Sequence, residues 1–242
     1  MRTFKILLTV FLFVFLSYSF SYARSVINFI DNTHYWPTWG NSDDNDTDTV
    51  GSPNFLGGTV TIEDGNLAGI SFDVEHWNSN LEFTDLFLDT NADDTWDYVV
   101  KLYTRSHGGS TDAGNYNVYE INAPENKSVG SRYYHLSYWD NPDPSAYRQD
   151  HPIAIKGRYL GSNIGTAYFS GVPSGETSFT TSFDFSGLNI SLDDEFIIAW
   201  QVQCANDIVY EKLRNPVPEP SSMLLVGLGL LAAGTWVRRR KV

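Results

Sequence analysis

Hydrophobic and polar residues alternate in short runs through the middle of the chain, with the period of half-buried β-strands. The clearest pair of runs is 59–63 (TVTIE) and 66–74 (NLAGISFDV), joined by Asp64 and Gly65. In the second run, alternate apolar residues share one face. An Asp-Gly pair suits a two-residue turn whose residues need positive φ. The pattern therefore predicts a β-hairpin.

Further runs of this kind are separated by clusters of Gly, Asn, Asp and Pro, which favour turns. They are 85–89, 98–104, 115–122, 133–138, 152–156, 166–169, 178–185, 195–203 and 207–211. Outside the two ends of the chain, no run of ten or more residues has the period of a helix. Many short strands at this spacing predict an all-β protein with a single antiparallel β-sandwich or jelly-roll domain over residues 24–214.

The N-terminal segment 1–23 has the pattern of a secretory signal peptide. Arg2 and Lys5 precede an apolar run over 6–20, and Ser21 and Ala23 place small residues where a signal peptidase cleaves. We expect a signal-peptide helix that is removed after Ala23. The alternative is a retained membrane anchor.

The C-terminal segment has three parts: a linker over 215–220, an uncharged apolar run within 221–237, and a basic tail over 238–242. The apolar run is about the shortest that spans a bilayer. Positive charge beside a span remains cytoplasmic, so the domain would face outward. The two prolines of the linker hold it extended. We expect a transmembrane helix preceded by an accessible peptide.

The order VPEP, apolar span and RRRK closely resembles the PEP-CTERM sorting signal of Gram-negative bacteria. The residues that carry the resemblance are Pro218, Glu219, Pro220, Arg238, Arg239 and Arg240. It implies processing near Pro-Glu-Pro by an exosortase, a membrane enzyme with a catalytic cysteine. The precursor would be anchored in the inner membrane, and the product would pass to the cell surface or the extracellular matrix. The stretches DLFLDTNADDTWDYVV and QCANDIV also look like parts of such surface proteins.

The chain of 242 residues is acidic, with a net charge of −13. Between residues 24 and 217 it has 10 Lys and Arg against 28 Asp and Glu, which disfavours nucleic acid and anionic lipid as partners. The single cysteine, Cys204, excludes an internal disulfide.

The best candidate for metal chemistry is the run DTNADDTWD between two predicted strands. Its candidate Ca²⁺ ligands are Asp89, Asn91, Asp93 and Asp97, because calcium takes six to eight oxygen ligands. The run starts like an EF-hand loop but departs from it at Asp94, where glycine is expected, and at Val100. The alternative is a solvated polar turn. A second acidic cluster over 43–48 has the same two interpretations.

Aromatic residues make up 15% of the chain. Trp36, Trp39 and Trp139 are candidates for a glycan-binding platform. The alternative is packing, since aromatic residues are favoured in β-proteins anyway. The histidines lack metal-ligand spacing, and Ser174 is one place late for a nucleophile elbow. We therefore expect no enzyme.

Three classes of function remain. The first, which we favour, is an exported structural or adhesive protein of the surface or exopolysaccharide matrix. Stabilisation of this protein by calcium is an additional hypothesis. The second is a jelly-roll carbohydrate-binding module in the same location. The third is a secreted hydrolase. Exosortase and exopolysaccharide are the expected partners.

Overall fold

The computed structural model describes residues 24–34, 36, 52–75, 82–104, 109–122, 151–203, 205, 207–216 and 229, and the backbone of 133–135. The strands are β1 (Arg24–Phe29), β2 (Asn54–Glu63), β3 (Asn66–Glu75), β4 (Leu86–Asp89), β5 (Tyr98–Val100), β6 (Gly114–Ile121), β7 (Tyr133–His135), β8 (Pro152–Ile155), β9 (Leu160–Phe169), β10 (Ser178–Asp184), β11 (Glu195–Gln201) and β12 (Ile208–Arg214). A short 3₁₀ turn, η4 (Gly157–Tyr159), precedes β9.

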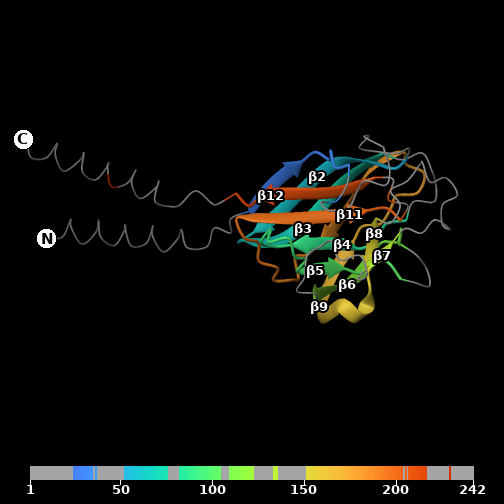
Figure 1. Ribbon diagram of the computed structural model, residues 1–242. Helices are drawn as coiled ribbons and strands as arrows, with labels where there is room; N and C mark the ends of the chain where they lie inside the picture. The colour runs from blue at the N-terminus through green and yellow to red at the C-terminus, as the bar shows by residue number, and fades with distance from the viewer. Residues whose placement is uncertain are drawn as a thin grey trace, which may run out of the picture.

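Ten of these strands form one antiparallel sheet in the order β1-β2-β3-β10-β9-β6-β5-β4-β11-β12. The sheet curls until its two edge strands, β1 and β12, approach each other, so the shape is nearly that of a barrel (Figure 1). The remaining pair, β7 and β8, is a separate two-stranded sheet. The predicted all-β antiparallel class is confirmed. The two layers expected of a sandwich are the two halves of one continuous sheet.

The predicted hairpin is present, and its turn residues explain it. Asp64 and Gly65 both have positive φ, 51° and 77°, and Glu63 is paired with Asn66. Two consecutive residues in this region are what a type I′ turn requires. Some strand predictions were too short: β2 begins at Asn54, before a bulge at Gly57, and β9 begins at Leu160. β1 was not predicted at all. β1 begins at Arg24, the first residue expected after the signal peptide.

Trp200 lies at the centre of the main core, which fills the inside of the curled sheet. Its ring stacks on Phe83 at 4.2 Å between centroids and packs on Phe72 at 4.5 Å. Its indole N–H donates to the carbonyl of Thr84 at 3.0 Å. The buried ring of Trp200 thus contacts residues from both halves of the sheet.

A second apolar cluster covers the outer side of β4, β5 and β11. Trp36, Trp96, Ile153 and Ile155 belong to it and are almost fully buried. Because of this cover, every residue of β4 and β8 is buried, and these strands lack the alternation of the rest. The sheet therefore has one covered half and one half that is open to solvent.

The buried carboxylate of Asp85 joins the sheet to β8. Its Oδ1 accepts the backbone N–H groups of Leu102 (3.1 Å) and Tyr103 (2.9 Å). Its Oδ2 accepts the ammonium of Lys101 at 2.5 Å and the N–H of Ile155 at 3.1 Å. This one side chain thus satisfies donors from two segments that no strand ladder pairs.

Candidate functional site

The acidic loop after β4 is folded around the side chain of Asp89, which is fully buried. Its Oδ1 accepts the backbone N–H groups of Asn91 and Asp93, each at 3.3 Å. The amide oxygen of Asn91 accepts the N–H of Asp93 at 3.1 Å, and Asp93 in turn accepts the N–H of Thr95 at 2.9 Å. The structure therefore brings together three of the four predicted calcium ligands.

The fourth predicted ligand, Asp97, is held in a different way. Its Oδ2 accepts both the N–H of Thr90 at 2.7 Å and the Thr90 hydroxyl at 2.5 Å, which closes the base of the loop. Among the residues that the structure describes, no three Asp, Glu, His or Cys side chains are grouped as a metal ion would require.

Asp94 takes the backbone conformation of the glycine that it replaces in the EF-hand pattern. Its φ is 69°, and Ala92 also has a positive φ of 54°. Asp tolerates this left-handed region better than most residues, at some cost in conformational energy. The departure at Asp94 therefore does not remove the sharp turn.

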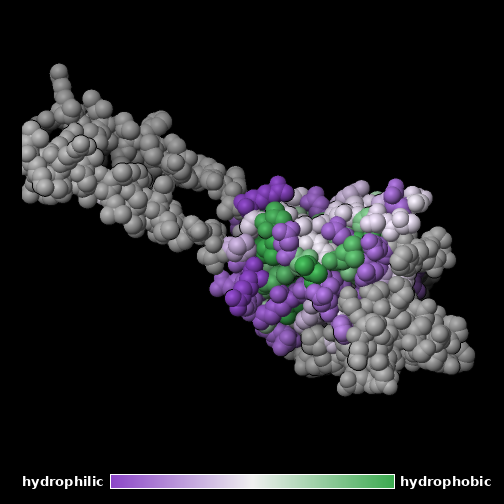
Figure 2. Space-filling view, turned by 90° about the horizontal axis from the view of Figure 1, so that it is seen from above, coloured by the Kyte–Doolittle hydropathy of each residue, from purple (hydrophilic) through white to green (hydrophobic). Residues whose placement is uncertain are grey.

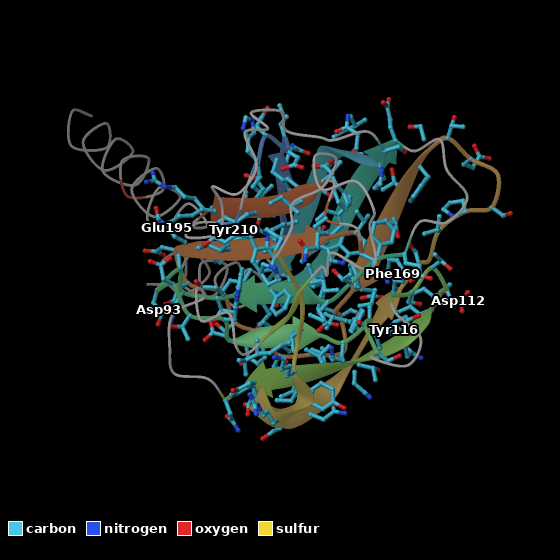
Figure 3. All side chains as sticks on the ribbon, turned by 45° about the vertical axis from the view of Figure 1, so that its right-hand side comes forward. Asp93, Asp112, Tyr116, Phe169, Glu195 and Tyr210 are labelled. Carbon is cyan, nitrogen blue, oxygen red and sulfur yellow. The ribbon has the colours of Figure 1, made fainter. Side chains whose placement is uncertain are left out.

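The loop is fixed to the fold through Trp96, whose ring is buried beneath it. This ring lies 5.4 Å from that of Phe87, 5.5 Å from Trp36 and 5.9 Å from Tyr210. Burial raises the pKa of Tyr210 well above its usual range, and the negative charges of Asp94 and Asp89 raise it further. The negative charge of the loop thus acts on the phenol of Tyr210, which is labelled in Figure 3.

The aromatic platform needs a correction at Trp36, which is 1% exposed and packs edge-on against Phe87 and His151. An indole in the second apolar cluster presents no face to a sugar. Its position follows from the covered half of the sheet, which the alternation of single strands does not reveal. Trp39 and Trp139 lie outside the described residues, as does the acidic cluster 43–48.

A polar surface that the sequence analysis did not single out covers the other half of the sheet. We call it the open face: the outward side chains of β2, β3 and β10, which are Thr59, Thr61, Ser71, Asp73, Thr180 and Ser182. Thr59 and Ser71 share a hydrogen bond of 2.7 Å, and the Thr180 hydroxyl donates to Asp73 at 2.6 Å. The alternation of polar and apolar residues in TVTIE and SFTTSFDF could have predicted this polar face.

A shallow groove of about 320 Å³ crosses this face. Thr59, Ser71 and Ser182 line its middle, with Arg24 and Asp184 also contributing. Tyr168 of β9, which is 48% exposed, is paired with Asp184 beside it. Seen from above the view of Figure 1, the molecule shows apolar patches among polar residues (Figure 2).

The end of the sheet at which β12 stops is held together by the segment 192–194. The N–H of Leu192 donates to Gly65 and that of Asp193 to Thr90, each at 2.9 Å. Asn215 is bonded to the same segment, with its N–H donating to Asp194 at 2.9 Å and its amide to Leu192 at 3.2 Å. We call this the exit end, because here the chain leaves the fold; it comprises Asp64, Gly65, Asn91, Asp93, Asp94, Leu192, Asp193, Asp194, Glu195, Arg214 and Asn215.

The fold and the exit end define a class of protein: an all-β domain that continues directly into a C-terminal tail. A family model described as the PEP-CTERM protein-sorting motif matches residues 216–241, which begin one residue after Asn215. The chain therefore carries this sorting motif and is an exported surface protein, whose precursor is membrane-anchored and processed by an exosortase. No curated protein and no solved structure matches the chain.

The residues of the motif, Pro218, Glu219, Pro220 and Arg238 to Arg240, lie outside the described residues, as does the predicted span 221–237 except for Gly229. Within the part of the chain that the structure describes, no helix has both the length and the hydropathy to cross a bilayer.

Proposed function

We propose that the mature β-domain is a structural or adhesive component of the cell surface or the exopolysaccharide matrix, that it has no catalytic role, and that it binds polysaccharide through the open face. The observation that carries this proposal is the difference between the two halves of the sheet. One half is covered by a second apolar cluster, whereas among the described residues no such cluster packs on the outer side of β2, β3 and β10, which carries small polar side chains.

The chemistry of the open face supports a hydroxyl-rich ligand. Hydroxyl groups both donate and accept hydrogen bonds, and Asp73 and Asp184 add acceptors. The exposed ring of Tyr168 beside the groove supplies a flat surface on which a sugar ring stacks. Rigid strands hold these groups in fixed register, which lowers the entropic cost of binding an extended polymer.

The test is calorimetric titration of the secreted domain, residues 24–216, with the exopolysaccharide of the host. Ser182→Gln places a longer side chain in the groove, next to Ser71 of β3. We expect it to weaken binding about five-fold, the effect of roughly one lost hydrogen bond. Ser174→Gln, in an exposed turn outside the open face, is the matched control. Equal affinity of both variants and the unaltered domain would refute the role of this face.

Calcium is the second element of the proposal, and the loop at Asp89 is where we place it. The cluster of Asp89, Asn91 and Asp93 oxygens and the left-handed backbone of Asp94 support it. A bound cation would stabilise the folded state by mass action. We expect millimolar Ca²⁺ to raise the melting temperature of the domain, and Asp93→Ala to abolish that rise. An identical melting temperature in Ca²⁺ and in EDTA would exclude it.

The alternatives make different predictions in the same titration. Polysaccharide binding that is abolished by EDTA would make the domain a calcium-dependent lectin, with the Asp89 loop rather than the open face as its essential element. Shortening of the polysaccharide during the experiment, lost on substitution of one carboxylate, would instead make it a hydrolase.

A further inference from the structure

The sorting motif starts almost directly at the folded domain. Asn215 is bonded to the segment 192–194 through both its backbone and its side chain. Only Pro216 and Val217 separate it from Pro218, the first residue of the Pro-Glu-Pro peptide. Asn215, the last residue with a hydrogen bond to the fold among those that the structure describes, is therefore four residues from Glu219.

This short connection limits how far the enzyme that reads the motif can be from the domain. Four residues span at most about 14 Å when fully extended. A helix that crosses the bilayer is about 30 Å long, so an enzyme built of such helices is much larger than this reach. An enzyme that holds Glu219 must therefore place its own surface against the exit end.

The exit end has a defined chemical character. Asp93, Asp94, Asp193 and Asp194 are exposed, and none has a cationic partner among the described residues. Glu195, by contrast, is neutralised by Lys212 at 2.6 Å and by Arg214 at 3.1 Å. A hollow of about 820 Å³ lies between these groups, lined by Asn91, Asp193, Asp194, Arg214 and Asn215 among others. Asp93 and Glu195 mark this end in Figure 3, opposite Asp112.

We propose that the exit end is a docking surface for the processing enzyme, which reads the folded domain through a basic outward-facing patch as well as the Pro-Glu-Pro peptide. The proposal rests on the sorting of this chain by an exosortase. Unpaired carboxylates next to the cleavage region favour a basic protein surface. An anionic bilayer would instead repel them.

The experiment follows the conversion of the full-length precursor to the shorter form by pulse-chase labelling in the host. Asp193→Lys with Asp194→Lys reverses two exposed charges of the exit end. The matched control, Asp112→Lys with Glu176→Lys, reverses two exposed charges outside it. We expect the first pair to slow processing about five-fold, as two exposed ion pairs would, and the second pair to leave it unchanged.

A spacer provides the test of proximity. Twelve Gly and Ser residues inserted between Asn215 and Pro216 add a mean reach of about 20 Å. With the spacer, the rate should no longer depend on the charges of the exit end.

Each other outcome has a distinct meaning. Processing of the 193/194 variant at the unaltered rate would overturn the docking surface. Faster processing would also overturn it, because it would show that the nearby surface is anionic lipid. Equal slowing by both pairs, or slowing that persists with the spacer, would mean an effect on export or folding. The variant Glu219→Gln tests the sorting independently of the docking surface. Unchanged processing of this variant would argue against an exosortase that reads Glu219, regardless of the result for the exit end.

Discussion

Replacement of Asp85 by asparagine should destabilise the domain strongly, although it changes no packing volume. Asparagine keeps the oxygen that accepts Leu102 and Tyr103. It places an NH₂ group, a donor, where Oδ2 now accepts both Lys101 and Ile155. The Lys101 ammonium and the Ile155 N–H, both donors, then face the donor NH₂ group of the asparagine, and Lys101 loses its counter-ion.

The size of this effect follows from the burial of the pair. Removal of one partner from a buried ion pair costs about 3–5 kcal/mol. The Asp85 side chain is fully buried, but that of Lys101 is 17% exposed and retains some water. We therefore expect the lower value, about 3 kcal/mol, which is about 6–12 °C in melting temperature for a domain of this length.

The assay is thermal and urea unfolding of residues 24–216, followed by circular dichroism at pH 7. Lys101→Met is the informative control, because the carboxyl group it leaves behind can take up a proton and keep its three backbone donors. It should cost less than Asp85→Asn. A loss below about 1 kcal/mol for Asp85→Asn, or a larger loss for Lys101→Met, would refute the assignment of Asp85 as the acceptor that joins β8 to the sheet.

Three further predictions use the same domain. Trp200→Ala should cost about 3–5 kcal/mol in urea unfolding, since it empties the centre of the main core; a cost near 1 kcal/mol would show that the core collapses around the gap. The pKa of Tyr210 is raised in the folded state, so its contribution to stability is complete below the ordinary tyrosine pKa of about 10 and is lost as the pH rises above it; Tyr210→Phe should flatten the fall in melting temperature between pH 9 and 11, and an unchanged slope would contradict the burial of the phenol. The pKa of Glu195 is lowered by Lys212 and Arg214, so the small stabilisation from this exposed pair should be present near neutral pH and lost in acid or in 1 M salt; a difference between Glu195→Gln and the unaltered domain that persists in 1 M salt would contradict it.

Local pattern was sufficient for much of the fold. The alternation in 66–74 and the Asp-Gly turn predicted β3 and its hairpin because both signals are contained within a few residues. β1 lies next to the signal peptide, and its run RSVINF was not distinguished from that segment. The layer formed by Trp36, Trp96 and β8 could not be predicted either, because a strand buried on both faces has no alternation.

The candidate sites likewise divide into those that a local pattern predicts and those that depend on long-range contacts. The ligand order Asp89, Asn91, Asp93 is local, and the structure brings these three side chains together. Asp97 was expected beside them, but the nearby Thr90 provides two donors for its carboxylate. The burial of Trp36 depends on contacts with residues more than fifty positions away, such as Phe87, which no local pattern contains. The exit end depends on Asn215 reaching the segment 192–194, which is again a long-range contact.

The position of the two strand ends has a mechanical consequence. β1 starts, and β12 stops, at the same end of the sheet, where Arg24 is paired with Glu63 and Arg214 with Glu195. A pull applied at either terminus therefore acts on one end of the domain, and tension along the chain does not pass through the core. A domain connected in this way is attached to its anchor at one end only and does not transmit force from one attachment point to another. Its opposite end, which carries Asp112, is left free to project away from whatever holds the chain.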